Sequence, residues 1–338
     1  MDKALLAHTI AALVASGKGL LAADESAGTC AKRFAVANIP DSEEMRRTYR
    51  EMLFTTPAMK STISGVILHD ETLRQKTSKG VPFADYLNSI GVIPGVKVDA
   101  GTRHLPAAPG ELISDGLDNL QARMKEYFAL GARFAKWRAV ITIGENIPTS
   151  RCIWANAHAL ARYAAICQEA GIVPVVEPEV LLDGDHDIDT SFNVTEAVLR
   201  TLMSQMADNH VSIEHTILKA SMVISGKDGK NRASQAEVGA RTLACLKRTV
   251  PGAMPGIVFL SGGQSDIDSA AHLNEMNLAK NNPWPLTFSY SRALHFTALK
   301  VWKGKPENYK AAQAAFAHRC KMNSLASKGK WTLAAESA

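Results

Sequence analysis

The chain has 338 residues, of which 46% are apolar and 21% charged, a composition typical of soluble globular proteins and unlike that of disordered or fibrous chains. Its 38 basic and 33 acidic side chains give a formal net charge of +5, without any block of five or six like charges. Such a chain lacks the concentrated basic patch of a nucleic-acid-binding protein, and it suits a small anionic substrate better.

The N-terminal segment, residues 1–16, is predicted to form an amphipathic helix rather than a signal peptide, because polar side chains interrupt its apolar stretch. Its apolar side chains share one helical face; these are Leu6, Ile10, Leu13 and Val14. No apolar run in the chain approaches the roughly 20 residues that span a bilayer. The five cysteines are widely spaced, which argues against a disulfide framework and a thiolate metal site. We therefore expect a cytoplasmic protein that binds neither nucleic acid nor a membrane.

Eight short apolar runs alternate with longer segments of helical pattern. The predicted strands are Gly19–Glu25, Ser64–His69, Ile93–Asp99, Phe134–Ile141, Ile172–Glu179, Thr216–Met222, Ile257–Ser261 and Leu286–Tyr290. Between them, Asn156–Ala170 and Ala233–Thr249 have the Ala and Leu spacing of helices that pack one face. Near-continuous apolar strands separated by helices indicate parallel pairing, buried on both faces.

Eight such units predict a single (β/α)8 TIM barrel, an α/β fold. The alternative is a doubly wound open sheet with a second domain, but no linker or shift in composition divides the chain. We therefore predict one domain over residues 1–338, with the helix of residues 1–16 at its start and a short C-terminal tail at 331–338.

Charged residues enter these buried runs, at the carboxyl end of the first and third runs and inside or toward the end of the others. They are Asp24 in the first run, Lys97 and Asp99 in the third, Lys136 and Arg138 in the fourth, Glu177 and Glu179 in the fifth, and Lys219 in the sixth. Spacing of two residues places each pair on one face of its strand, and a buried unpaired charge costs several kcal/mol. In a barrel these side chains would line the active site. The alternative is a structural network of ion pairs that closes the barrel mouth.

Among the lysines, Lys219 has apolar neighbours and no acidic residue on its own strand. An ammonium group among apolar groups and near other cations loses its proton more easily, and a neutral amine can attack a carbonyl to form a Schiff base. Lys97 shares its face with Asp99, which would keep it protonated. Lys136, beside Arg138, is better placed as an electrostatic group. The spacing alone favours Lys219 only modestly over Lys136.

Two polar segments follow the last two predicted strands. Ser261-Gly262-Gly263-Gln264-Ser265 offers backbone N–H groups and hydroxyls to an anion, and Ser289-Tyr290-Ser291-Arg292 adds a guanidinium. Phosphate sites in barrels are often built from the loops after strands seven and eight. Together the two segments predict a phosphate site.

Other motifs do not point to function. The P-loop, G-x-G-x-x-G, G-x-S-x-G and H-E-x-x-H patterns are absent. The acidic run Asp183–Asp189 resembles part of a calcium loop but lacks its turn glycine, so we expect a solvated loop that caps the following helix. His69 ends the second run without another histidine nearby, which predicts a packed, hydrogen-bonded side chain rather than a ligand.

In their order and spacing, these segments resemble the class I (Schiff-base) fructose-bisphosphate aldolases over roughly residues 5–331. The matching stretches are Leu21–Ser26, Gly95–Asp99, Phe134–Arg138, Val176–Glu179, Phe259–Ser265 and Thr287–Tyr290. The resemblance implies a metal-independent enzyme without a cofactor, which reversibly cleaves fructose 1,6-bisphosphate into dihydroxyacetone phosphate and glyceraldehyde 3-phosphate. It also implies a homotetramer.

The same resemblance implies the roles of individual residues. The lysine matching Lys219 forms the iminium, and Glu177 moves protons during dehydration of the carbinolamine with support from Glu179. Asp24 takes the hydroxyl proton as the carbon–carbon bond breaks, and Lys136 is an assisting cation. One phosphate is bound by Ser261, Gly262, Gly263, Ser289 and Arg292. The other phosphate and the sugar hydroxyls are bound by Ser26, Thr29, Lys32, Arg33, Lys97 and Arg138.

The chain departs from the family pattern at three places. Ala220-Ser221 replaces the common Pro-Asn after the lysine, and Ser291 replaces the usual glycine, which would change the approach of the backbone to the phosphate there. The last residues contain no counterpart of the terminal tyrosine that helps proton exchange in animal members. A transaldolase-like Schiff-base enzyme and a non-catalytic scaffold are the alternative functions. The sequence leaves open the preference between fructose 1,6-bisphosphate and fructose 1-phosphate.

Overall fold

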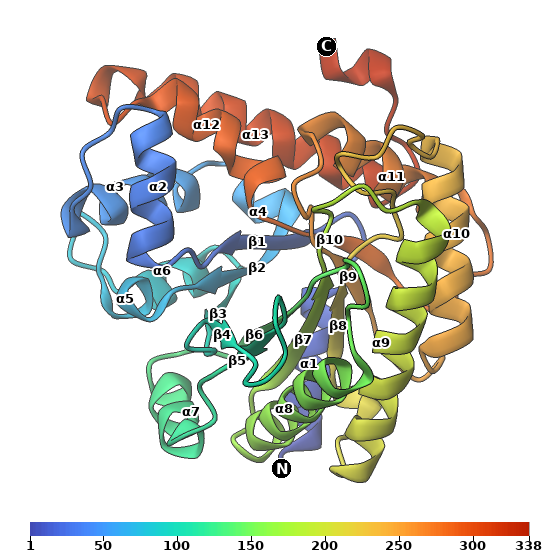
Figure 1. The fold of residues 1–338 in the computed structure, drawn as a ribbon. Coiled ribbons are helices and arrows are strands. Elements are labelled where there is room, and N and C mark those ends of the chain that lie inside the picture. Colours follow the sequence, from blue (N-terminus) through green and yellow to red (C-terminus); the bar gives the residue numbers. More distant parts are fainter. Residues whose placement is uncertain (338) are drawn as a thin grey trace.

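The computed structural model describes residues 1–337 and shows a closed barrel of parallel strands surrounded by helices (Figure 1). The barrel strands are β1 (Gly19–Ala23), β2 (Ile63–Leu68), β3 (Ile93–Lys97), β6 (Phe134–Ile141), β7 (Val173–Val180), β8 (Ile217–Ala220), β9 (Ile257–Phe259) and β10 (Leu286–Tyr290). They follow one another around the barrel in chain order, and β10 pairs with β1 to close it. The predicted (β/α)8 fold is confirmed.

Most differences from the predicted strands lie at their carboxyl ends. Phe134–Ile141 and Leu286–Tyr290 agree with the prediction, whereas β1, β3, β8 and β9 each end two residues earlier than expected. The residues beyond the ladder include Asp24, Asp99 and Ser261, which leave the sheet and line a cavity. A hairpin of β4 (Thr102–His104) and β5 (Leu112–Ser114) was not predicted, because both strands are too short to show a periodic pattern.

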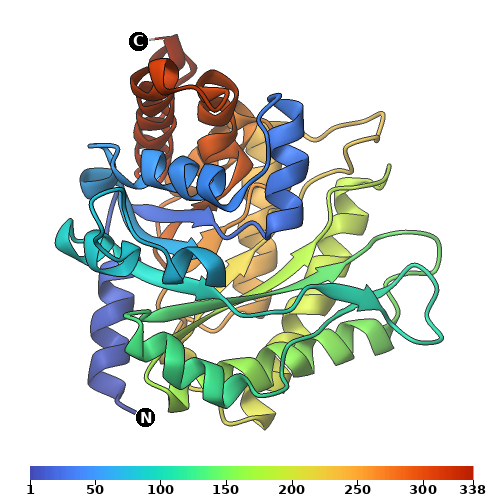
Figure 2. The same ribbon diagram turned by 90° about the vertical axis from the view of Figure 1, so that its left-hand side faces the viewer.

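The helices cover the outside of the barrel (Figures 1 and 2). They are α2 (Ala27–Val36), α3 (Glu43–Phe54), α4 (Met59–Thr62), α5 (Asp70–Arg74), α6 (Phe83–Ser89), α7 (Leu120–Ala129), α8 (Ser150–Glu169), α9 (Ile188–Asp208), α10 (Gln235–Thr249), α11 (Asp266–Leu278), α12 (Arg292–Trp302) and α13 (Tyr309–Ala326). The predicted helical segments coincide with parts of α8 and α10, except that Ala170, Ala233 and Ser234 lie just outside these helices. Helix α8 begins earlier than expected because Thr149 accepts a hydrogen bond from the Cys152 amide and caps it. No helix within residues 1–337 is long and apolar enough to cross a membrane.

Helix α1 (Lys3–Leu13) lies within the segment predicted as a helix, residues 1–16, and closes the amino-terminal end of the barrel. Its side chains Leu6, Ile10 and Leu13 are fully buried against inward-facing side chains of the strands, including Phe134. The Phe134 ring fills the space beside Gly95, where a Cβ atom would lie 2.4 Å from the ring. This end of the barrel is therefore a packed apolar core, which leaves the carboxyl end open for polar side chains.

The C-terminal tail packs on the body of the protein. Its short helix η3 (Leu333–Ser337) places Glu336 beside Arg319, 2.8 Å from Nε1 of Trp331 and 3.2 Å from Nε2 of His318. The predicted tail extends to residue 338, which lies outside the described residues.

Candidate active site

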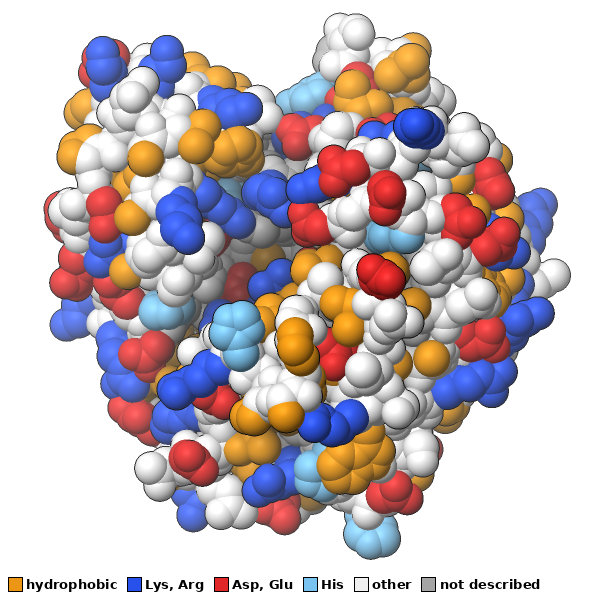
Figure 3. All heavy atoms as spheres, viewed as in Figure 1, with side chains coloured by type: hydrophobic (Ala, Val, Ile, Leu, Met, Phe, Trp, Pro, Cys, Tyr) orange, Lys and Arg blue, Asp and Glu red, His pale blue; other side chains and the backbone are white. Residues whose placement is uncertain are grey.

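A cavity of about 790 Å³ opens at the carboxyl end of the barrel. Figure 3 shows it as a hollow bordered by lysine and arginine side chains. Fifteen of the sixteen predicted site residues line it: Asp24, Ser26, Thr29, Lys32, Arg33, Lys97, Lys136, Arg138, Glu177, Glu179, Lys219, Ser261, Gly262, Ser289 and Arg292. The remaining residue, Gly263, has a φ of +98° in the turn after β9, and a Cβ atom there would lie 3.4 Å from Nη2 of Arg292. The fold thus brings together residues from all parts of the chain.

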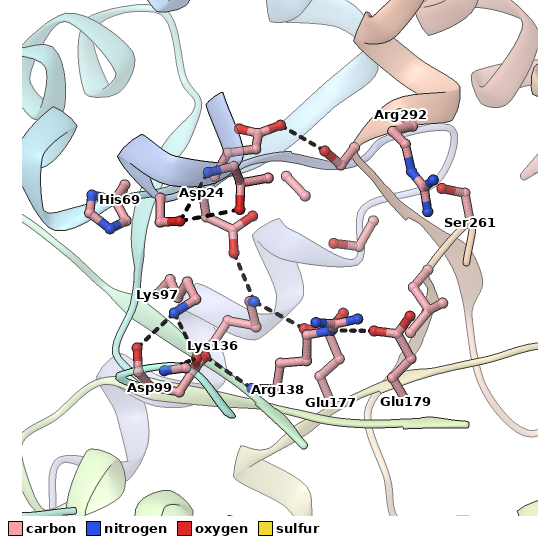
Figure 4. Close-up of a pocket in the computed structure, with 18 of the residues that line it drawn as sticks. Asp24, His69, Lys97, Asp99, Lys136, Arg138, Glu177, Glu179, Ser261 and Arg292 are labelled. Atoms are coloured by element: carbon pink, nitrogen blue, oxygen red, sulfur yellow. Dashed lines mark hydrogen bonds and ion pairs between the residues drawn. The ribbon is translucent and has the colours of Figure 1, made fainter. Parts of the chain in front are cut away.

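Four alternating charges form the centre of the site. The Lys136 ammonium lies 2.7 Å from Oδ2 of Asp24 and 3.1 Å from Oε2 of Glu177. The Lys219 ammonium lies 2.9 Å from the other oxygen of Glu177, Oε1. Figure 4 shows Lys136 between the two carboxylates. Two ammonium groups therefore face two carboxylates, and Glu177 contacts both lysines.

The effect of burial on the pKa values of these four groups is opposed by the attraction between their charges. Burial alone would raise the pKa of the Asp24 and Glu177 carboxyls, but Lys136 and Lys219 lower both. Burial alone would lower the pKa of the Lys136 ammonium, but Asp24 and Glu177 raise it above its usual value. Because the protons of such closely spaced groups are coupled, one proton can move between them at little cost.

The surroundings of Lys219 differ from those expected from the sequence. Its own strand offers no carboxylate, as predicted, but neighbouring β7 supplies one. Val176 pairs with Leu218, so the next residues, Glu177 and Lys219, emerge side by side. The sequence did not reveal this neighbouring carboxylate, because the register between strands cannot be read from the local pattern.

Two further ion pairs lie beside this cluster: the expected Lys97–Asp99 pair and an Arg138–Glu179 pair that was not predicted. Lys97 lies 2.6 Å from Oδ1 of Asp99 and donates to the Asp99 carbonyl at 2.7 Å. Arg138 pairs with Glu179 from the neighbouring strand, and although burial opposes it, this carboxylate raises the pKa of the guanidinium. Both ion pairs lie at the wall of the cavity.

The segments after β9 and β10 form a polar wall of the cavity that carries the Arg292 guanidinium. Arg292 begins α12 and faces the turn of Ser261 and Gly262. Within residues 1–337 it forms no ion pair with a carboxylate, and desolvation together with the nearby Arg33 lowers its pKa. The Ser289 hydroxyl is buried and has no hydrogen-bond partner among the same residues. An unpaired cation and an unsatisfied hydroxyl in one wall are suited to a phosphate group.

Glu25 is a central residue of the site that the sequence did not reveal. Its buried carboxylate pairs with Arg33, accepts a hydrogen bond from the Ser291 hydroxyl at 2.9 Å and lies 3.1 Å from Nε2 of His295. Burial raises the pKa of this carboxyl, but His295 and Arg33 lower it well below the usual range. The feature of the sequence that could have pointed to Glu25 is its position directly after Asp24, at the polar end of the first apolar run.

Ser291 contributes its side chain to the site. Its φ is −105°, so the position does not require glycine. Its hydroxyl accepts a hydrogen bond from Nη1 of Arg33 at 2.8 Å and donates to Glu25. The replacement of glycine noted in the sequence therefore links α2 to the start of α12 and places Arg33 near Arg292.

His69 is hydrogen-bonded as predicted, since its Nδ1 accepts from the Glu71 amide at 3.4 Å, but it also lines the cavity. The acidic run Asp183–Asp189 caps the next helix as expected, with Asp187 accepting from the Thr190 amide at 2.7 Å. Within the described part of the chain, no three His, Cys, Asp or Glu side chains are grouped so that they could hold a metal ion.

Comparisons with known proteins agree with this geometry. Residues 5–338 match the family model described as glycolytic, fructose-bisphosphate aldolase class-I. A probable fructose-bisphosphate aldolase class 1 of Xanthomonas campestris pv. campestris is 59% identical over 327 residues, which cover 96% of this chain and 98% of the relative. The cytosolic fructose-bisphosphate aldolase 6 of Arabidopsis thaliana is 52% identical over 314 residues, 93% of this chain and 87% of the relative.

A solved structure is similar over nearly the whole chain. It is the fructose-bisphosphate aldolase of Plasmodium falciparum, crystallised with TRAP and a small-molecule inhibitor. The TM-score is 0.96 at 44% identity, and the match covers 97% of this chain and 95% of the other.

Proposed function

The chain belongs to the family of class I fructose-bisphosphate aldolases, and from this premise we propose that it acts through a Schiff base on Lys219, without a metal ion. The family membership itself establishes an enzyme of aldol cleavage that acts on fructose 1,6-bisphosphate. The observation that carries the proposal is the 2.9 Å contact between Nζ of Lys219 and Oε1 of Glu177 at the bottom of the basic cavity.

The first step is the attack of Lys219 on the ketose carbonyl. The amine must give up a proton to become a nucleophile, and Glu177 lies where it can accept that proton. The resulting carbinolamine loses water when Glu177 returns a proton to the departing hydroxyl. The product is a cationic iminium on Lys219.

The second step is cleavage of the carbon–carbon bond. Asp24 takes the proton from the hydroxyl at C4, the bond between C3 and C4 breaks, and its electron pair moves into the iminium to form an enamine. The aldehyde product leaves, the enamine gains a proton at C3, and hydrolysis releases dihydroxyacetone phosphate and the free lysine. Because the iminium withdraws the electron pair, the scheme requires no metal ion as an electron sink.

Lys136 is proposed to act as a fixed positive charge. Asp24 and Glu177 both contact its ammonium and raise its pKa, so it remains protonated and is a poor nucleophile. It keeps the two carboxylates in place on opposite sides of the reacting carbons. This difference in partners favours Lys219 over Lys136 as the nucleophile. Glu179 pairs with Arg138 on the neighbouring strand β6. We propose that it supports the proton transfer by compensating the positive charge of this guanidinium.

The two phosphates would bind at opposite walls of the cavity. Ser261, Gly262, Gly263, Ser289 and Arg292 are proposed to hold one phosphate. Ser26, Thr29, Lys32, Arg33, Lys97 and Arg138 are proposed to hold the other phosphate and the sugar hydroxyls. The unpaired Arg292 and the unsatisfied Ser289 hydroxyl support the first of these sites. We further propose a cytoplasmic homotetramer of single-domain subunits, as the family resemblance implies and as the cytosolic Arabidopsis relatives suggest.

Replacement of the lysine tests the proposal. Lys219→Met keeps the length of the side chain and removes the amine, so we expect the rate of fructose 1,6-bisphosphate cleavage to fall by at least about a thousandfold. Dialysis against EDTA should leave the activity of the unsubstituted enzyme intact. Cleavage that survives in Lys219→Met, or that is lost with EDTA and restored by a divalent metal, would show that the proposed chemistry is wrong.

A further inference from the structure

His69 lines the active-site cavity but has no part in the chemistry proposed above. It follows β2 directly and is half-buried. Figure 4 shows it on the same side of the cavity as Asp24 and Lys97. A titratable ring at this position requires an explanation beyond packing.

The strand register places His69 in a layer with known charged residues. Ala23 of β1 pairs with Leu68 of β2, and Leu68 pairs with Val96 of β3. The residues that come next in the chain are Asp24 and His69, directly after the ends of β1 and β2, and Lys97, the last residue of β3. The three side chains therefore emerge at one level of the barrel mouth, from three neighbouring strands, and His69 follows the strand between the other two.

The hydrogen bond at Nδ1 of the His69 ring indicates that the other nitrogen, Nε2, is a hydrogen-bond donor. Nδ1 accepts a hydrogen bond from the Glu71 amide at 3.4 Å, so the proton of the neutral ring is on Nε2. Within residues 1–337 the bond to Nδ1 is the hydrogen bond that the ring forms, and none joins Nε2 to another group. The N–H group is thus available to a ligand in the cavity.

The charges around His69 keep the ring neutral. Burial lowers its pKa, and Arg50 on α3 and Lys97 on β3 act in the same direction. Glu71 and Asp24 oppose them without reversing the shift. A neutral imidazole donates one hydrogen bond but carries no charge, which suits a hydroxyl oxygen better than a phosphate.

The position of His69 across the barrel from Lys219 indicates which part of the substrate lies near the His69 ring. β2 and β8 are separated by three strands in each direction around the barrel, so His69 and Lys219 lie on opposite sides of the mouth. With C2 attached to Lys219, the half of the sugar that becomes the aldehyde extends toward β2. Asp24 serves the hydroxyl at C4, and His69 comes next in the same layer.

We propose that Nε2 of His69 donates a hydrogen bond to the C5 hydroxyl of the substrate and thereby selects the aldehyde half. The assignment rests on the proposed function, because it takes Lys219 as the attachment point of C2. It makes His69 a further specificity-determining residue of the cavity.

Two matched variants separate this role from the capping of α5. Asn is a good helix cap but is too short to reach the substrate, whereas Gln reaches further and caps poorly. We expect kcat/KM for fructose 1,6-bisphosphate cleavage to fall about 5- to 10-fold in His69→Asn and about 2-fold or less in His69→Gln. The opposite order, with Asn close to the unsubstituted enzyme and Gln impaired, would assign only a capping role and overturn the proposal.

A substrate that lacks the hydroxyl provides the second readout. In the condensation direction, 3-phosphooxypropanal lacks only the hydroxyl that becomes the one at C5, whereas glyceraldehyde 3-phosphate carries it. We expect His69→Asn to lose 5- to 10-fold in kcat/KM with glyceraldehyde 3-phosphate and less than about 2-fold with 3-phosphooxypropanal. An equal loss with both aldehydes would contradict a contact with this hydroxyl.

Borohydride reduction with dihydroxyacetone phosphate separates this proposal from the proposed function. That ketone lacks the aldehyde half, so His69→Asn should be modified as fast as the unsubstituted enzyme. Absence of an adduct in the unsubstituted enzyme would refute the Schiff base itself. A normal adduct together with unchanged kcat/KM in His69→Asn would refute only the role of His69.

Discussion

Glu177 and Lys219 emerge from neighbouring strands as a contact pair, with Oε1 of the carboxylate 2.9 Å from Nζ of the amine. The other oxygen of Glu177 lies 3.1 Å from the Lys136 ammonium. One carboxylate therefore touches both the proposed nucleophile and the proposed fixed cation. This arrangement lets a single group remove a proton from Lys219, which leaves both of these groups neutral, while the Lys136 ammonium stays paired with the Asp24 carboxylate.

Removal of the Glu177 carboxylate should slow the formation of the iminium. Glu177→Gln keeps the shape of the side chain but cannot exchange a proton, so we expect kcat for cleavage to fall about 100- to 1,000-fold. Glu179→Gln is the matched control, because Glu179 pairs with Arg138 and not with Lys219. We expect a smaller loss of kcat in Glu179→Gln, measured as the rate of cleavage at saturating substrate. Equal losses in the two variants would contradict the assignment of proton transfer to Glu177.

Glu25 should contribute stability that disappears in acid. Its pKa in the folded protein is well below the usual value, so near pH 4 the unfolded chain binds the proton and the folded protein does not. This stabilisation is complete above the unfolded pKa and is lost as the pH falls toward the folded pKa. We expect Glu25→Gln to lower the free energy of unfolding by about 3 kcal/mol at pH 7.

Urea unfolding between pH 7 and pH 3 measures this effect. The unsubstituted protein should lose stability steeply below about pH 4.5, and Glu25→Gln should lose less over the same interval. Parallel pH curves for the two proteins would show that the Glu25 carboxylate does not contribute in this way.

Arg292 should bind phosphate without supporting the fold. Because it forms no ion pair with a carboxylate within residues 1–337, Arg292→Met should leave Tm within about 2 °C of the original. The same variant should raise KM for fructose 1,6-bisphosphate at least about 10-fold. Inorganic phosphate should raise the Tm of the unsubstituted protein and have a weaker effect on the variant. A large loss of Tm with unchanged KM would assign Arg292 a structural role.

Helix α1 should stabilise the barrel without taking part in catalysis. Ile10 is buried against the strand side chains at the end opposite the cavity. Ile10→Ala should therefore lower the free energy of unfolding by about 2–4 kcal/mol, measured in urea. The kcat of the folded variant should remain within about 2-fold of the original. If kcat falls strongly under conditions in which the variant is fully folded, this end of the barrel takes part in catalysis and the prediction is wrong.

The sequence predicted the barrel because each strand is a short apolar run buried on both faces. It also predicted the inward-facing pairs Lys136/Arg138 and Glu177/Glu179, since a spacing of two residues fixes their common face. The roles of single residues came from the family resemblance, and the mutational tests above address them.

Contacts between distant strands could not be predicted. The Glu177–Lys219 pair depends on the register of β7 and β8, which the local pattern leaves undetermined. Glu25 meets His295 from the other end of the chain, and only the closed barrel brings them within 3.1 Å. The short β4–β5 hairpin was missed because three-residue strands carry no detectable period.

The most direct test of the Schiff base is to trap it. Borohydride should inactivate the enzyme in the presence of dihydroxyacetone phosphate but not in its absence, and peptide mass mapping should place a single reduced adduct on Lys219. An adduct on Lys136 or Lys97 would contradict the assignment of the nucleophile. The absence of any adduct in an enzyme that cleaves fructose 1,6-bisphosphate would contradict the covalent mechanism.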